Sequence, residues 1–187
     1  MTMNRKDTEN KLAIIDIDDV LSNTTPRMLD EVNRLLGSDY KIEDMDSYYL
    51  WENFPISKED VYSIAVSESL VASLEPLPNS IEGVSRLKKS GFQIWLVTAR
   101  PENLRAITIN WLNIYRIQFD KLVMGLVGSE KTNNIPKHIE LAIEDRYDTA
   151  LAFSKISNKV YMLIRPWNKD KQLPDNVKGI CSWDEIE

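Results

Sequence analysis

Apolar positions along the chain form short continuous runs that alternate with segments of helical spacing. The runs have the length of buried strands and lie at residues 11–16, 92–98, 121–125, 139–145, 159–164 and 177–183. The segments 80–91 and 100–117 repeat their apolar residues at helical intervals. Buried strands that alternate with helices favour a parallel sheet covered by helices on both faces. The pattern therefore predicts an α/β fold with a Rossmann-like sheet.

The stretch between the first two strands is far longer than an ordinary crossover of a dozen or so residues. Its first part predicts a helix with Thr25 as N-cap, Pro26 at the first helical position and Gly37 at the end. Residues 57–74 predict one further helix, whereas residues 39–55 have no clear period and are rich in aromatic side chains. The stretch thus has the character of a helical insertion.

This insertion divides the chain into two predicted domains. We expect an α/β core formed by residues 1–23 and 79–187, and a small helical cap formed by residues 24–78. A length of 187 residues suits one domain that carries an insertion.

Composition is that of a soluble globular protein, with 43% hydrophobic and 28% charged residues. No apolar run approaches the roughly 20 residues that span a bilayer, and residues 1–10 lack the apolar core of a secretory signal. The single cysteine, Cys181, fits a reducing compartment. We therefore expect a cytoplasmic protein with no membrane partner.

Charge and ligand chemistry narrow the choice of partners. A net charge of −6 argues against a protein that coats nucleic acid, which needs a basic face. With only His138 and Cys181 as nitrogen and sulfur ligands, the chain cannot build an ordinary zinc site. Any bound metal is expected to be a hard cation held by oxygen atoms.

Polar side chains follow the predicted strands where a parallel sheet binds its ligands, at the carboxyl ends. They are Asp16, Asp18 and Asp19 after the first strand, Thr98, Ala99 and Arg100 after the second, Lys131 after the third, and Glu144 and Asp145 after the fourth. Two unit charges about 4 Å apart repel by roughly 4 kcal/mol near a protein surface, so the acids require a cation or raised pKa values. Oxygen ligands of this kind suit Mg²⁺, and a hydroxyl and an ammonium suit a phosphate.

The ordered set resembles the haloacid-dehalogenase-like phosphohydrolases. In that family a strand ending in DxD is followed by a strand ending in Thr or Ser, then by a Lys, then by a strand ending in paired acids. The stretches DIDDVLSN, LVTARP, SEKT, IEDRYDTA, RPWN and ICSWDEI further resemble the 5′(3′)-deoxyribonucleotidases and their bacterial nucleotidase relatives. The resemblance implies a haloacid-dehalogenase-like fold and a Mg²⁺-dependent phosphomonoesterase.

The resemblance also implies roles for individual residues. Asp16 becomes the nucleophile and a metal ligand, and Asp18 becomes the general acid and base whose backbone carbonyl also binds the metal. Asp145 becomes the third ligand of the metal. Thr98, the adjacent Ala99 and Lys131 become phosphate-binding residues, and Lys131 also orients Asp16. A carboxylate nucleophile splits the slow hydrolysis of a phosphate monoester into two easier steps through an aspartyl phosphate.

Several neighbouring residues leave alternatives open. Glu144 departs from the usual Asp-Asp pair and is expected to support the ligands, and Asp148 is expected to be a surface residue or a helix cap rather than a ligand. Asp19 could serve only to cap a backbone N–H. Lys137 competes with Lys131, which we prefer because it opens the segment leading to the last acids. Arg100 could contact the substrate, but an arginine at a strand end is more often in a surface ion pair, which is the interpretation we prefer.

Aromatic side chains in the irregular part of the insertion raise the question of specificity. Stacking of a base on an aromatic ring contributes roughly 1 to 3 kcal/mol, which makes a nucleoside slot at Trp51 and Phe54 one interpretation. The alternative is a small hydrophobic core that holds the cap to the body of the protein. The two interpretations have equal support from the sequence.

The leading functional hypothesis is a 5′-nucleotidase that acts on (deoxy)nucleoside monophosphates. One alternative is the same chemistry on another small phosphate ester, such as a phosphosugar. A non-enzymatic alternative is a phospho-accepting receiver module, although its Lys would follow the acid pair rather than precede it. The sequence leaves the base preference, the pathway and any self-association to homo-oligomers open.

Overall fold

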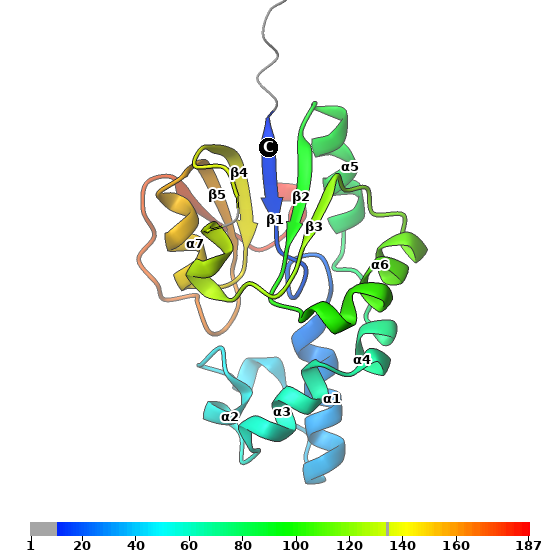
Figure 1. The fold of residues 1–187 in the computed structure, drawn as a ribbon. Helices are drawn as coiled ribbons and strands as arrows, with labels where there is room; N and C mark the ends of the chain where they lie inside the picture. Colours follow the sequence, from blue (N-terminus) through cyan, green and yellow to red (C-terminus); the bar gives the residue numbers. More distant parts are fainter. Residues whose placement is uncertain (1–10, 134) are drawn as a thin grey trace, which may run out of the picture.

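The computed structural model describes residues 11–133 and 135–187, so the polar segment 1–10 lies outside the described residues. Its centre is a six-stranded sheet in the order β3-β2-β1-β4-β5-β6, and every neighbouring pair of strands is parallel (Figure 1). The strands are β1 (Leu12–Ile15), β2 (Gln93–Val97), β3 (Lys121–Val123), β4 (Ile139–Glu144), β5 (Ser157–Leu163) and β6 (Val177–Ile180). The predicted parallel α/β sheet is confirmed.

Helices cover both faces of this sheet, because successive side chains of a buried strand point to opposite faces. The seven α-helices of the described residues are α1 (Thr24–Leu36), α2 (Leu50–Asn53), α3 (Lys58–Ala65), α4 (Glu68–Ser73), α5 (Ser80–Lys89), α6 (Arg105–Ile114) and α7 (Tyr147–Ser154). In β1, Ala13 and Ile15 pack with residues of α5 and α6. Leu12 and Ile14 pack on the other face with residues of α7. Within the described ranges, none of these helices combines the length and the apolarity needed to cross a membrane.

The helices α1 to α4 lie beyond the carboxyl ends of the strands, below the sheet in Figure 1. The inner faces of α1 to α3 form a hydrophobic cluster that is separate from the two clusters on the sheet, whereas Val71 of α4 packs with Leu104 and Met124. The cluster of α1 to α3 contains Leu29, Val32, Met45, Leu50, Phe54, Val61 and, from the loop after β5, Trp167. These helices therefore stand over the edge of the sheet where the polar strand ends collect.

Two details of the insertion differ from the sequence prediction. The predicted helix over residues 57–74 is two helices, because the chain breaks at Val66 and the side chain of Ser67 then caps α4 by accepting from Leu70 N. The first helix begins at Thr24 instead of after Thr25. The preceding loop provides an acceptor for a backbone N–H group at the start of this helix, since Asp19 accepts a hydrogen bond from Thr25 N at 2.9 Å.

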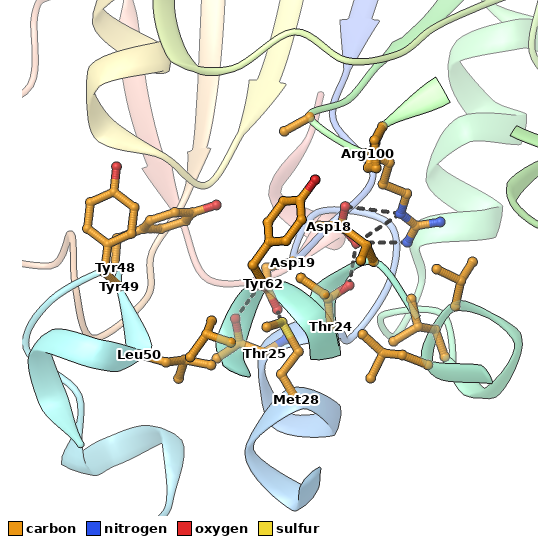
Figure 2. Close-up of a pocket in the computed structure, with 18 of the residues that line it drawn as sticks. Asp18, Asp19, Thr24, Thr25, Met28, Tyr48, Tyr49, Leu50, Tyr62 and Arg100 are labelled. Atoms are coloured by element: carbon orange, nitrogen blue, oxygen red, sulfur yellow. Dashed lines mark hydrogen bonds and ion pairs between the residues drawn. The ribbon is translucent and has the colours of Figure 1, made fainter. Parts of the chain in front are cut away.

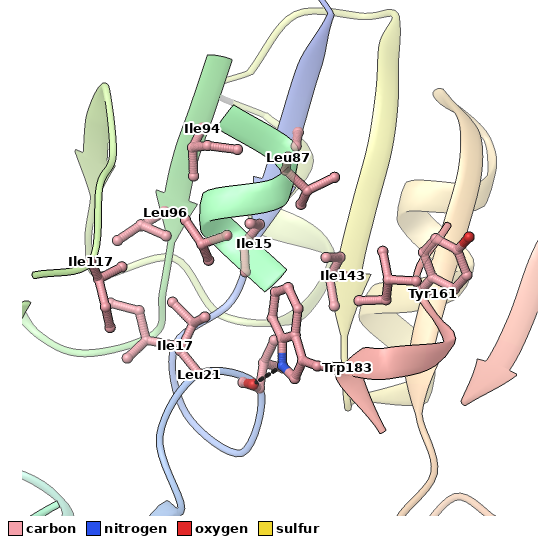
Figure 3. Packing of buried hydrophobic residues seen from close by; sticks show 14 of the residues in the cluster. Ile15, Ile17, Leu21, Leu87, Ile94, Leu96, Ile117, Ile143, Tyr161 and Trp183 are labelled. Carbon is pink, nitrogen blue, oxygen red and sulfur yellow. Dashed lines mark hydrogen bonds between the residues drawn. The ribbon is translucent and has the colours of Figure 1, made fainter. Parts of the chain in front are cut away.

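The end of the chain packs under the loop that follows β1. Trp183 is buried between α5 and this loop, and its indole N–H donates to the carbonyl of Val20 at 2.7 Å (Figure 3). Gly83 on α5 is required there, because a Cβ atom at this position would lie 2.1 Å from the Trp183 ring. A residue far away in sequence thus supports the loop that carries Asp16, Asp18 and Asp19.

Candidate active site

Three buried carboxylates meet at the carboxyl ends of β1 and β4. One carboxylate oxygen from each of Asp16, Glu144 and Asp145 lies within 4.8 Å of the other two. The ammonium of Lys131 enters from the loop after β3 and lies 2.7 Å from Asp16 Oδ2 and 2.5 Å from Glu144 Oε1. Because β1 and β4 are parallel neighbours, their last residues reach the same edge of the sheet. The result is a buried group with three acids and one base.

The electrostatics of this group follow from burial and from the excess of acids. Burial raises the pKa of Asp16 to about 7, and Glu144 and Asp18 add to the rise while Lys131 opposes it. Burial also raises the pKa of Asp145 well above its usual value, with further contributions from Glu144, Asp19 and Asp16. Burial would lower the pKa of Lys131, but Asp16 and Glu144 raise it above its usual value. Lys131 therefore stays charged and offsets only part of the negative charge.

The donor set around Asp145 fits a hard divalent cation. Asp145 is 2% exposed, and its Oδ2 atom is buried without a hydrogen-bond partner among the described residues. A buried carboxylate oxygen without a partner is costly unless a cation meets it. Glu144 is already occupied, since it accepts from Lys131 and from the backbone N–H groups of Asp145 and Arg146. Asp145 Oδ2 is thus the oxygen of this group without a partner among the described residues, whereas Asp16 accepts from Ile17 N at 2.8 Å and from Lys131 at 2.7 Å and would bind a cation through its remaining lone pairs.

Asp18 points away from the three acids and toward β2. Its Oδ1 accepts from Arg100 Nη2 at 2.7 Å and from the hydroxyl of Thr24 at 2.7 Å. Thr98, at the end of β2, brings its hydroxyl to 3.5 Å from Asp18 Oδ2. Burial would raise the pKa of Asp18, but the charge and hydrogen bonds of Arg100 and the Thr24 bond lower it below its usual value. Asp18 is therefore an ionised carboxylate held by a buried guanidinium.

A cavity of about 290 Å³ lies between this rim and the helices α1 to α4. Figure 2 shows Asp18 and Arg100 on its sheet side, with Met28, Leu50 and Tyr62 on its helical side. Its lining is mainly apolar, and the polar groups are concentrated where the loop after β1 meets it. The cavity can hold an apolar or aromatic group next to Asp18 and Asp19, whereas the cluster of Asp16, Glu144 and Asp145 does not line it.

Comparison with known proteins shows the family to which a chain with this geometry belongs. The model of the family "5′ nucleotidase, deoxy (pyrimidine), cytosolic type C protein" matches residues 10–132, which is more than half of the chain. The chain belongs to this family. A nucleotidase of Clostridium acetobutylicum is 26% identical over 174 residues, and the match covers 92% of this chain and 89% of the relative. The chain is accordingly a phosphoric monoester hydrolase, as the sequence predicted.

Solved structures show the fold to which this nucleotidase family member belongs. A haloacid-dehalogenase-like hydrolase of Streptococcus pneumoniae superposes with a TM-score of 0.63 at 13% identity, covering 95% of this chain and 96% of the other. A hydrolase of the same superfamily from Bacillus subtilis, solved with bound magnesium, gives a TM-score of 0.61 at 10% identity, with the same coverage. These likenesses confirm the predicted haloacid-dehalogenase-like fold.

The structure brings together most of the residues that the sequence singled out. Asp16, Lys131 and Asp145 are in one buried group. Thr98 lies beside this group, and its hydroxyl is 3.5 Å from Asp18 Oδ2. Ala99 is exposed and lines the cavity. Lys137, the competitor of Lys131, is exposed.

Arg100 is a correction to the sequence prediction. It was expected in a surface ion pair, but it is 5% exposed and binds Asp18 inside the site of the nucleotidase. The LVTARP stretch carries this residue, yet its strand position alone does not indicate which way the side chain turns. Asp148 is half-exposed as expected, and it pairs with Arg146 at 2.6 Å in the first turn of α7.

For Phe54 the structure agrees with the second interpretation, a small hydrophobic core, rather than with a nucleoside slot. This side chain is buried in the cluster of the helical insertion and stacks on Tyr40 with ring centroids 4.3 Å apart, and it does not line the cavity. Trp51 does line the cavity, but its ring stacks on Tyr49 at 4.4 Å, and Lys58 Nζ lies over the ring at 5.3 Å. Sequence reasoning missed Tyr62, which is 64% exposed and lines the cavity, because an aromatic residue on a helix gives no signal of its own.

Proposed function

We propose that the chain is a Mg²⁺-dependent 5′-nucleotidase that hydrolyses (deoxy)nucleoside monophosphates through an aspartyl phosphate on Asp16. The observation that supports this most directly is the partnerless Oδ2 of Asp145 beside Asp16 and Lys131. Family membership supports the substrate class, and a magnesium-bound structural relative supports the choice of metal.

Asp16 and Asp145 would hold the cation through their carboxylates, with the backbone carbonyl of Asp18 as a third ligand. Bound Mg²⁺ would supply positive charge that stabilises the transferring phosphoryl group. The ammonium of Lys131 would bind another oxygen of the same phosphoryl group. Its contact with Asp16 also orients the nucleophilic carboxylate. Thr98 and the backbone N–H of Ala99 would bind the remaining phosphate oxygens at the end of β2.

The reaction then proceeds in two displacements. An Asp16 oxygen attacks phosphorus, the bond from phosphorus to the ester oxygen breaks, and Asp18, which takes up a proton after it leaves Arg100, gives that proton to the departing nucleoside oxygen. In the second step Asp18 takes a proton from water, whose oxygen attacks the phosphorus and releases Asp16 and phosphate. Asp18 has to turn from Arg100 to serve these steps, because its carboxylate is engaged there in the present structure.

The cavity favours a nucleotide over a phosphosugar. Its lining by Met28, Leu50, Val61 and Val71 offers apolar surface to a base, whereas the hydroxyl groups of a sugar would lose hydrogen bonds to water there. Tyr62 presents an exposed ring at the same cavity. We accordingly propose residues 24–78 as a cap that contacts the nucleoside, over a core formed by 1–23 and 79–187. A cytoplasmic location remains a prediction.

Phosphate release from a panel of nucleoside monophosphates and sugar phosphates tests this function. We expect nucleotides to turn over fastest, EDTA to stop the reaction and added Mg²⁺ to restore it. Faster turnover of a sugar phosphate than of any nucleotide would reject the substrate class. Activity that ignores both EDTA and Mg²⁺ would reject the metal.

A further inference from the structure

The RPWN stretch, residues 165–168, follows β5 and takes no part in the chemistry proposed above. It forms a closed turn, because Arg165 N donates to Asn168 Oδ1 at 2.9 Å and Asn168 N donates to the Arg165 carbonyl at 3.1 Å. Asn168 is 1% exposed. Arg165 Nε and Trp167 Nε1 are buried without a partner among the described residues, whereas the buried amide of Asn168 is hydrogen-bonded at both its oxygen and its nitrogen. The contacts that the turn does make indicate its purpose.

Those contacts reach the two loops that carry the acids. Asn168 Nδ2 donates to the carbonyl of Asp145 at 2.6 Å, and to the carbonyl of Leu163 at 2.8 Å. Arg165 Nη2 donates to the carbonyl of Asp19 at 2.7 Å. One turn therefore holds the loop after β1 and the loop after β4 through their backbones.

The position of Asp145 depends on this backbone support. Its N–H donates to Glu144 Oε2 at 3.0 Å, and its carbonyl accepts from Asn168, so the peptide groups on both sides of its Cα are fixed. Its side chain has no such support, because Oδ2 lacks a partner among the described residues. Of the hydrogen bonds given above for Asp145, all are made by its backbone, so they fix the point from which its carboxylate starts.

Trp167, in the same turn, anchors it to the helical insertion. Its ring joins the hydrophobic cluster of α1 to α3 and meets the edge of Tyr48, with ring centroids 6.0 Å apart. The turn is consequently fixed on three sides and can act as a rigid support.

We propose that Asn168 is a positioning residue that aims the Asp145 carboxylate at the cation, with Arg165 holding the facing loop in register. This inference rests on the proposed function, since it takes Asp145 as a metal ligand. Removing a group that orients a metal ligand typically weakens metal binding by about 10- to 100-fold. Asn168→Ala is expected to weaken Mg²⁺ binding within that range.

The chain offers a matched control in Asn176. Its Nδ2 also donates to two backbone carbonyls, those of Ser154 at 2.9 Å and Ser157 at 3.0 Å, at the opposite end of β5. Asn176→Ala removes the same two amide donations without touching either acid-bearing loop, whereas Asn168→Ala also removes the acceptor of Arg165 N. We expect it to lower the free energy of unfolding while leaving Mg²⁺ binding unchanged.

The experiment is Mg²⁺ titration by calorimetry on the purified full chain, with unfolding by urea measured in parallel in EDTA. The inference is supported if Asn168→Ala weakens Mg²⁺ binding at least tenfold more than Asn176→Ala does. Equal binding by both variants overturns it. If Asn168→Ala does not fold, Asn168→Ser, which keeps one donor, decides by the same comparison.

Mg²⁺ titrations of two further proteins, the wild-type chain and Asp145→Asn, distinguish failure of this inference from failure of the proposed function. If the wild-type chain binds no Mg²⁺, or Asp145→Asn binds it as well as wild type, the proposed metal site fails. If wild type binds Mg²⁺, Asp145→Asn does not, and Asn168→Ala binds normally, only the positioning role fails.

Discussion

The metal-free acid cluster should destabilise the protein, and Asp145→Asn measures by how much. Oxygens of Asp16, Glu144 and Asp145 lie within 4.8 Å of one another. At an effective dielectric constant of about 20, two unit charges at that separation repel by roughly 3.5 kcal/mol. The substitution removes the repulsions from Glu144, Asp19 and Asp16 and the attraction to Lys131, which is the smallest of these charge effects. The surplus is at least one such repulsion, so we expect a gain of about 3 kcal/mol in the free energy of unfolding in EDTA at a pH where Asp145 is ionised.

The pH dependence of this gain has a definite sign. The folded-state pKa of Asp145 is raised by burial and by its acidic neighbours, so the native state binds a proton that the unfolded state releases. The wild-type chain in EDTA therefore loses stability as the pH rises from about 4, the ordinary pKa, toward the raised value. Asn cannot titrate, so the advantage of Asp145→Asn is smallest near pH 4 and grows as the pH rises toward the raised pKa of Asp145.

Urea denaturation in EDTA at several pH values measures this difference in stability. In Mg²⁺ we expect the order to reverse, with the wild type more stable than Asp145→Asn. Mg²⁺ that binds only the folded wild type stabilises it, whereas Asp145→Asn loses that stabilisation. Asp148→Asn is the control, because its half-exposed carboxylate pairs only at the surface, and a change within about 0.5 kcal/mol is expected. A variant Asp145→Asn that is less stable than wild type in EDTA at pH 8 refutes the reasoning.

Three other changes test the remaining contacts. Asp16→Asn should lower phosphate release by several powers of ten while the circular dichroism spectrum stays native, and a fresh variant that keeps most activity contradicts the nucleophile. Lys131→Met should lower the free energy of unfolding by about 3 to 5 kcal/mol in urea, because Asp16 and Glu144 lose their ammonium. Lys88→Met breaks only the partly exposed pair with Asp120 and should lose about 1 kcal/mol or less, so equal losses contradict the reasoning. Trp183→Phe should lower the free energy of unfolding by about 1 to 3 kcal/mol, because the Val20 carbonyl loses its donor, and an unchanged urea midpoint argues against that bond.

The sequence predicted the acid cluster because the topology of a parallel sheet determines where the residues that follow its strands lie. Parallel strands end at one edge of their sheet, so Asp16, Lys131 and Asp145 were expected together once the strands were identified. The observed ammonium contact of 2.7 Å between Lys131 and Asp16 needs no more than that topology and a loop of suitable length.

The contacts that the sequence did not predict depend on loops and on irregular backbone. Asp19 has φ 55°, in the left-handed region, and the loop it bends decides that Asp18 faces Arg100. Trp51 lies in a helix of only four residues and Phe54 directly follows it, so no periodicity separates a buried face from an exposed one. The Asn168 amide reaches Asp145 across 23 positions of sequence, a contact that no local pattern encodes.

The charge balance of the site gives one reason why Asp18 is held apart. Asp16, Glu144 and Asp145 with Lys131 leave two negative charges, which one divalent cation neutralises. An unpaired Asp18 beside them would add a third and raise the pKa values of its neighbours further, as it already does for Asp16. The guanidinium of Arg100 offsets that charge at 2.7 Å. The arrangement therefore fits one divalent cation in an otherwise acidic protein, and it leaves Lys131 available for the phosphate that the cation helps to bind.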